Sequence, residues 1–215
     1  LAKQDKSLQR ELDILLKLKE ALEAGKSARS VEFDAPEDYE FVQTLTLLTA
    51  KPVLFVCNVE EDKAATGNSQ SDRVAEMAAA QGAGQVVISA KIEEEISQLP
   101  ADEATMFLEE MGLHEAGLDR LIREGYKLLG LDTYFTVGPK EARAWTIHHG
   151  TLAPQAAGVI HGDFERGFIR AETVAYDDYV TYKGEAGARE AGKFRVEGKS
   201  YEVKDGDVLH FLFNA

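Results

Sequence analysis

Residues 51–58 read Lys51-Pro52-Val53-Leu54-Phe55-Val56-Cys57-Asn58, and this stretch decides the fold class of the chain. Five consecutive apolar residues that end at a polar Asn are typical of a strand buried on both faces of a parallel sheet. The segment Gln85-Val86-Val87-Ile88-Ser89-Ala90 repeats the pattern, and residues 71–81 between the two have the apolar spacing of a helix. The order strand, helix, strand predicts a parallel sheet. Because only two such strands occur, we expect half of an open α/β domain.

The first residues have the spacing of a coiled-coil helix. Leu1, Leu8, Leu15 and Leu22 recur every seven residues, with polar side chains on the other faces. The sequence opens inside this helix and without a Met, so we expect a piece of a longer protein. We interpret the helix as the second of a two-helix arm; an ordinary core helix is the alternative. Further helices are expected over residues 36–49, 103–111 and 117–129.

The pattern changes after residue 131, where short alternating segments replace long helices. A single helix is expected over residues 153–160, after Pro154. Strands are expected over residues 133–137, 142–147, 167–174, 193–196, 200–203 and 208–213. The chain is therefore α/β followed by α+β. We expect three parts: a helical arm over residues 1–30, the α/β half-domain over 31–130, and an α+β module over 131–215.

The composition excludes several classes of protein. The chain has 24 Lys and Arg against 38 Asp and Glu, a net charge of −14, which argues against a nucleic-acid binder that works by charge alone. A lone cysteine, Cys57, excludes a disulfide framework and a Cys-rich zinc site, and it fits a reducing cytosol. We expect Cys57 to be buried. No apolar run approaches the roughly 18 residues that span a bilayer, so no membrane partner is expected.

Polar residues follow both predicted strands. Asn58 and Glu61 follow the first, and Ser89, Ala90 and Lys91 follow the second. Ligands of open parallel sheets bind outside the carboxyl ends of the strands. An Asn donates and accepts hydrogen bonds, an ionised Glu only accepts, and backbone N–H groups can face a ring atom. Together these groups could read the edge of a purine. The alternative is a helix N-cap in an acidic loop.

Asn58-Val59-Glu60-Glu61 followed by Ser89-Ala90-Lys91 resembles the two base-recognition motifs of P-loop GTPases. The usual first motif is Asn-Lys-x-Asp; here Val59 replaces the Lys and Glu61 replaces the Asp. The altered motif, the helical arm before it and the final module after it together resemble the Obg-like ATPase (YchF) family. This resemblance covers essentially the whole chain. Residues 156–172 are also similar to that family. The final module resembles its TGS domain, a ubiquitin-like β-grasp.

The resemblance implies a cytoplasmic, translation-associated switch that binds ATP or GTP and contacts the ribosome or its RNA and proteins. The base would be held by Asn58, Val59 and Glu61, with Ser89, Ala90 and Lys91 closing the pocket. An Asp in this motif accepts two hydrogen bonds from guanine. Glu is one methylene longer and should lose that pairing, so the site should tolerate or prefer adenine. Val59 can supply only apolar contact.

No Gly-x-x-x-x-Gly-Lys-Ser/Thr motif occurs in the sequence. In the family, the residues that hold phosphate and Mg²⁺ precede the helical arm. We therefore expect the intact protein to be an ATP- or GTP-hydrolysing P-loop NTPase, and this chain alone to be inactive, with no catalytic residue of its own. Two alternatives are a non-enzymatic adaptor that binds through its TGS module, and a fragment of a stringent-response enzyme or a synthetase.

Weaker signals lie in the final module. Arg166 and Arg170, near several aromatic residues, could contact RNA or a protein. His148, His149 and His161 do not have the spacing of a zinc site, so we expect surface histidines and no metal.

Overall fold

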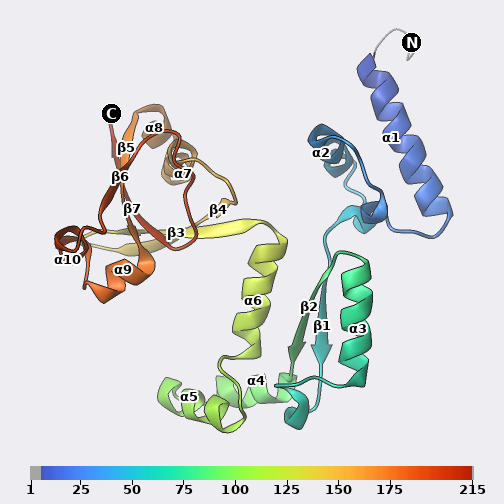
Figure 1. The fold of residues 1–215 in the computed structure, drawn as a ribbon, viewed down its shortest axis with the longest axis horizontal. Helices are drawn as coiled ribbons and strands as arrows, with labels where there is room; N and C mark the ends of the chain where they lie inside the picture. Colours follow the sequence, from blue (N-terminus) through green and yellow to red (C-terminus); the bar gives the residue numbers. More distant parts are fainter. Residues whose placement is uncertain (1–5, 215) are drawn as a thin grey trace. The chain divides into compact units, whose positions relative to one another are not determined.

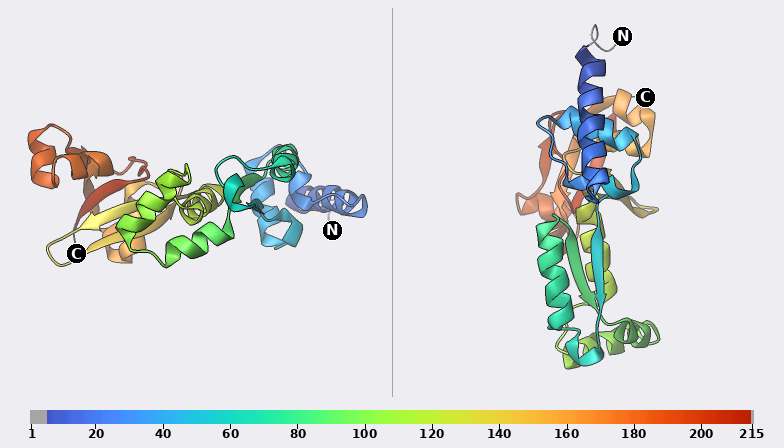
Figure 2. Two further views of the ribbon diagram at one scale, coloured as in Figure 1. Left: turned by 90° about the horizontal axis from the view of Figure 1, so that it is seen from below. Right: turned by 90° about the vertical axis from the view of Figure 1, so that its right-hand side faces the viewer.

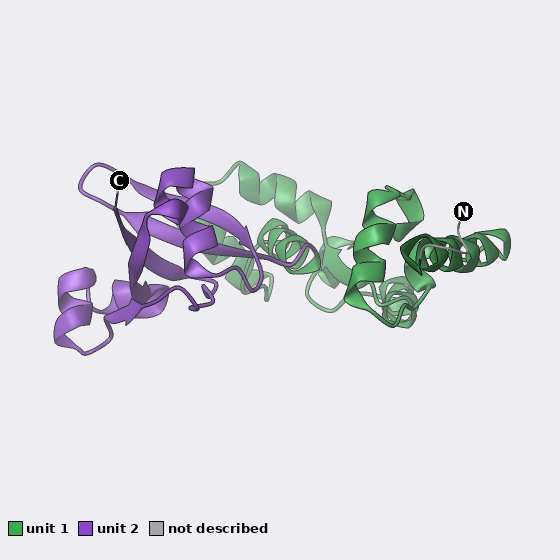
Figure 3. Ribbon diagram, turned by 90° about the horizontal axis from the view of Figure 1, so that it is seen from above, with its two compact units in different colours: residues 1–128 green, residues 129–215 purple. Residues whose placement is uncertain are grey.

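The computed structural model describes residues 6–214. The chain divides into two compact units, residues 1–128 and residues 129–215 (Figure 3). Unit 1 contains a two-stranded parallel sheet with helices, and unit 2 contains a five-stranded mixed sheet with helices (Figure 1). No helix among residues 6–214 combines the length and the apolar character that crossing a membrane requires.

The first helices of unit 1 share a small apolar core. Helix α1 (Lys6–Glu23) buries Ile14 and Leu18 against Val42 of helix α2 (Pro36–Thr44). The heptad leucines of α1 that the structure describes are exposed instead: Leu8, Leu15 and Leu22. Leu1 lies outside the described residues. Two short 3₁₀ turns, η1 (Ala28–Ser30) and η2 (Leu48–Ala50), complete this region.

Helix α2 is shorter than the sequence predicts. It begins at Pro36, whose fixed φ suits the first helical position. It ends at Thr44, not at residue 49, because Thr46 has a φ of 51°, in the left-handed region that stops a right-handed helix. The prediction of a helix over 36–49 was wrong in its second half.

Strands β1 (Leu54–Asn58) and β2 (Gly84–Ile88) pair in parallel, as predicted, and helix α3 (Ser69–Ala80) connects them. Asn68 begins α3 with a capping box: its side chain accepts the N–H of Gln70 and of Ser71, each at 3.0 Å. That box starts the helix two residues before the predicted residue 71. Helix α3 lies on one side of the two strands and helix α6 (Gly117–Leu128) on the other (Figures 1 and 2).

The strands are less buried than the sequence predicts. No residue of β1 is fully buried, Val56 is 44% exposed, and Cys57 is half-buried. Among the described residues β1 pairs only with β2, so two helices and one neighbouring strand do not cover it completely. The expectation of a strand buried on both faces, and of a buried Cys57, was therefore wrong.

Two more helices follow β2. Helix α4 (Ala90–Ser97) begins directly after the strand, and helix α5 (Ala101–Glu110) packs on it. Ile92 of α4 is buried against Ala64 and Leu113. The short 3₁₀ turn η3 (Glu61–Lys63) lies after β1. Unit 1 thus places a helical turn after the carboxyl end of each strand.

Unit 2 is a mixed sheet with the strand order β4-β3-β7-β5-β6, in which β3 and β7 are parallel and the other neighbours antiparallel. The strands are β3 (Leu131–Val137), β4 (Ala142–His148), β5 (Phe168–Ala175), β6 (Arg195–Glu197) and β7 (Asp207–Phe213). The expected strand over 200–203 is reduced to one bridge, Leu152 with Glu202.

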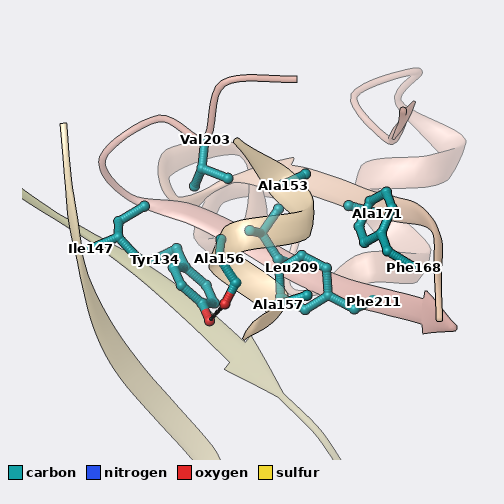
Figure 4. Close-up of a cluster of buried hydrophobic side chains, with 10 residues drawn as sticks. All are labelled: Tyr134, Ile147, Ala153, Ala156, Ala157, Phe168, Ala171, Val203, Leu209 and Phe211. Carbon is teal, nitrogen blue, oxygen red and sulfur yellow. Dashed lines mark hydrogen bonds between the residues drawn. The ribbon is translucent and has the colours of Figure 1, made fainter. Parts of the chain in front are cut away.

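The core of unit 2 lies between this sheet and helix α7 (Ala153–Ile160), whose bounds match the prediction (Figure 4). Three fully buried alanines, Ala153, Ala156 and Ala157, let the helix approach the sheet closely. Tyr134 of β3 is fully buried and donates its hydroxyl to the carbonyl of Ala156 at 2.8 Å. Burial raises the pKa of Tyr134. Three short helices were not predicted: α8 (Gly162–Arg166), α9 (Tyr176–Thr181) and α10 (Glu185–Glu190).

Candidate functional site

The ends of β1 and β2 are joined by two hydrogen bonds. The Oδ1 atom of Asn58 accepts the backbone N–H of Ala90 at 2.9 Å, and the N–H of Val59 donates to the carbonyl of Ile88 at 2.9 Å. Asn58 is the register partner of Ile88, so the parallel pairing brings the two polar segments to one edge of the sheet. The structure thus brings together the residues after both strands, as the sequence predicts.

An ion pair makes a second link between the same segments. Glu61 opens the turn η3, Lys91 is the second residue of α4, and the Lys91 ammonium contacts the Glu61 carboxylate. Both side chains are exposed to solvent. The hydrogen bond to Glu61, with its negative charge, raises the pKa of Lys91 above its usual value. The Glu61 carboxylate therefore faces the segment of residues 89–91.

Two residues of the site lie inside the protein. Ser89 is 2% exposed, and its buried hydroxyl oxygen has no hydrogen-bond partner among the described residues. A buried hydroxyl without a partner is unfavourable, so a group placed beside Ser89 could gain a hydrogen bond. Val59 is 8% exposed, and its backbone is held by Ile88. The structure does not present the Val59 side chain to solvent.

Helix α4, which carries Ala90 and Lys91, is fixed to helix α6 by Glu93. The Glu93 carboxylate accepts the backbone N–H of Gly117 at 2.7 Å and that of Leu118 at 3.0 Å. The sequence pattern did not predict this contact. One signal was available: Ala116, which precedes α6, has no side-chain acceptor, so the first N–H groups of α6 need an acceptor from elsewhere.

Arg166 and Arg170 belong to unit 2. Arg166 of α8 is 76% exposed and is paired with Asp163, and Arg170 of β5 lies 4.0 Å from Glu172. Each arginine therefore has a carboxylate neighbour that reduces its positive field. Both remain accessible to a partner.

The predicted histidines lie on the surface. Nδ1 of His149 is 2.9 Å from Asp132, and Nδ1 of His161 is 3.4 Å from Asp163. Within residues 6–214, no three His, Cys, Asp or Glu side chains gather in a group that could hold a metal ion. We assign no residue of the chain to Mg²⁺.

Comparison with known proteins identifies relatives along the whole chain. Residues 131–214 match the family model YchF-GTPase_C, described as a protein of unknown function (DUF933). The ribosome-binding ATPase YchF of Bacillus subtilis is 57% identical over 217 residues, which cover 100% of this chain and 59% of that protein. The protein of the same name from Escherichia coli O157:H7 is 50% identical over 210 residues, 98% of this chain and 57% of that protein.

Among solved structures, the YchF GTPase of Schizosaccharomyces pombe superposes with a TM-score of 0.81 at 34% identity, over 96% of this chain and 55% of that one. This match places the chain in the class of mixed α/β proteins that share the fold of a GTPase. The chain belongs to the YchF family, of which it represents the C-terminal portion. It spans somewhat more than half the length of the relatives it matches.

Proposed function

We propose that unit 1 carries the purine-recognition part of a P-loop NTPase that prefers ATP and acts with the translation machinery. One observation carries this proposal: Asn58 Oδ1 accepts the N–H of Ala90 at 2.9 Å, which unites the two motif segments at the carboxyl ends of parallel strands. This edge is where open α/β sheets bind ligands. Family membership, together with relatives named ribosome-binding ATPases, supports the same conclusion.

The groups at this edge suit a flat heterocycle with donors and acceptors on its rim. Asn58 offers the NH₂ group of its amide, because its Oδ1 is already bonded to the Ala90 N–H, and Ser89 offers a hydroxyl that lacks a partner among the described residues. An adenine edge presents both a donor and acceptors, which amide and hydroxyl groups can satisfy together.

Adenine preference follows from the acid at position 61. A carboxylate that binds guanine through two hydrogen bonds must present both oxygens to two N–H donors of the base. Glu61 is longer than the usual Asp, and its carboxylate is already engaged by Lys91. Binding guanine would require Glu61 to give up this ion pair, whereas adenine makes no such demand.

The proposal also assigns each of the three parts of the chain to a domain of the intact protein. We assign residues 1–30 to the second helix of a two-helix arm, because Leu8, Leu15 and Leu22 form an exposed apolar stripe. Residues 31–130 would be the C-terminal half of the P-loop domain. Residues 131–215 would be a ubiquitin-like β-grasp (TGS) domain, supported by a mixed sheet that packs on α7.

The TGS domain would bind the ribosome or associated RNA and protein in the cytoplasm, with Arg166 and Arg170 as contacts. Hydrolysis would require the P-loop and Mg²⁺ ligands of the intact protein. The 215-residue chain alone would release no phosphate.

Equilibrium titration of the intact natural protein with ATP tests the proposal. Asn58→Ala should weaken ATP binding by about tenfold or more, because it removes the amide that faces the base. Glu61→Ala should also weaken ATP binding, because it releases Lys91, which closes the proposed site. Asp62→Ala, in the same η3 turn and exposed, is the matched control and should change nothing. No nucleotide affinity in the intact protein would favour the non-enzymatic adaptor instead.

A further inference from the structure

We propose that Glu93 is a positioning residue for the proposed base site. Its side chain ties the first turn of α4 to the start of α6 and thereby couples nucleotide binding to the position of α6. The inference rests on the proposed function, since the pocket it positions is the purine site at Asn58 and Ala90. It assigns to Glu93 and Gly117 a role that neither base-recognition motif contains.

The contact is a carboxylate that caps a helix from outside. Glu93 accepts the N–H groups of Gly117 and Leu118 at 2.7 and 3.0 Å, so each carboxylate oxygen takes one of the first N–H groups of α6. These groups have no acceptor within their own helix. The negative charge also lies at the positive end of the helix dipole. Glu93 is half-buried, which reduces screening by water.

Gly117 makes this close approach possible. A Cβ atom at this position would lie 2.7 Å from Oε1 of Glu93 and 2.9 Å from Cγ2 of Ile88. Both distances are too short for a side chain, and Ile88 belongs to the strand that ends at the pocket. Alanine at position 117 would therefore push Glu93 or the end of β2 out of place, although alanine is the better helix former.

The backbone of Glu93 is also hydrogen-bonded to Ser89, a residue of the proposed base site. Its backbone N–H donates to the carbonyl of Ser89 at 3.0 Å, which closes the first turn of α4 around Ala90 and Lys91. On the same turn Ala90 donates to Asn58. A shift of α6 is therefore transmitted through the Glu93 side chain to Ser89 and Ala90. By reciprocity, a ligand that orders Ser89 and Ala90 should order the start of α6.

Hydrogen exchange of the intact natural protein, with and without ATP, tests this coupling. In the wild type, ATP should slow exchange of the Gly117 and Leu118 amides by about tenfold. In Glu93→Gln, one amide loses its acceptor, so ATP should no longer slow that exchange, and ATP affinity should fall by roughly tenfold. Glu94→Gln removes a neighbouring exposed carboxylate and should behave as the wild type.

Gly117→Ala provides a second variant, with Gly125→Ala as its matched control because a Cβ at position 125 of the same helix meets open space. Gly117→Ala should reproduce the loss of ATP affinity, and Gly125→Ala should not. If Glu93 were merely structural, ATP would leave exchange at Gly117 and Leu118 unchanged in the wild type; that result overturns the inference. ATP binding that is lost in Asn58→Ala but retained in both Glu93→Gln and Gly117→Ala also overturns it, and leaves the proposed function standing. Absence of ATP binding in the wild type overturns both.

Discussion

Asn58 and Ala90 are joined across two parallel strand ends by a hydrogen bond of 2.9 Å, in which the side chain of one segment accepts the backbone N–H of the other. The bond uses the Oδ1 atom of the Asn58 amide and holds the two segments together at one edge of the sheet. A side chain that bonds its own protein in this way is held in a defined orientation. The hydrogen bond therefore fixes the orientation in which the Asn58 amide would meet a ligand.

Asn58→Asp separates the two roles of this residue. The carboxylate keeps an acceptor for the Ala90 N–H but loses the amide donor. We expect the melting temperature of the intact protein to change by less than about 2 °C, and ATP affinity to fall by about tenfold or more. Thermal unfolding and equilibrium titration measure the two effects. A loss of stability equal to that of Asn58→Ala would contradict a specific role in ligand binding.

The ion pair of Lys91 and Glu61 should be visible in a pH titration. Glu61 raises the pKa of Lys91, so this favourable interaction is complete below the usual lysine pKa of 10.5 and is lost as pH rises through the higher folded-state value. Glu61→Gln should return the Lys91 pKa toward 10.5. The ¹³Cε chemical shift of Lys91 reports its protonation. Identical titration curves in the wild type and the variant would show that the pair does not form in solution.

The hydroxyl of Tyr134 should contribute to the stability of unit 2. Tyr134→Phe removes a buried hydrogen bond to Ala156 without changing the packing of the ring. We expect the free energy of unfolding to fall by about 1 kcal/mol. Tyr182→Phe, on a more exposed tyrosine, is the control and should have no measurable effect. Urea unfolding followed by the fluorescence of Trp145, which lies in the same unit, measures both.

Tyr201 should lose its proton only at unusually high pH. Burial, together with its 2.7 Å hydrogen bond to the buried Asp207, raises the pKa of Tyr201 to about 12. Because the pKa is higher in the folded chain, this tyrosine contributes stability that is complete below pH 10 and is lost as pH rises toward 12. Asp207→Asn should lower the pKa. Ultraviolet absorbance of tyrosinate during an alkaline titration measures the shift, and an unchanged curve in the variant would contradict the assignment.

Local patterns predict the elements of this fold well. The apolar runs before Asn58 and Ser89 predicted the two parallel strands, and Pro154 with the apolar residues after it predicted α7. The meeting of Asn58 with Ala90 was also predictable, because the carboxyl ends of neighbouring parallel strands share one edge.

Long-range contacts and local backbone geometry were not predictable. The Glu93 carboxylate bonds Gly117, which lies 24 residues further along, and no local pattern contains this pair. Thr46 adopts a left-handed conformation that a threonine rarely takes, so the early end of α2 had no signal in the sequence. The incomplete burial of β1 depends on which strands are beside it, and the apolar pattern of residues 53–57 does not contain that information.

A crystal structure of the intact natural protein with an ATP analogue would show directly where the base binds. We predict that the adenine ring lies at the carboxyl ends of β1 and β2, with its edge within hydrogen-bond distance of the Asn58 amide. An adenine ring bound elsewhere, with Asn58 and residues 89–91 not in contact with it, would contradict a purine site at this edge of the sheet.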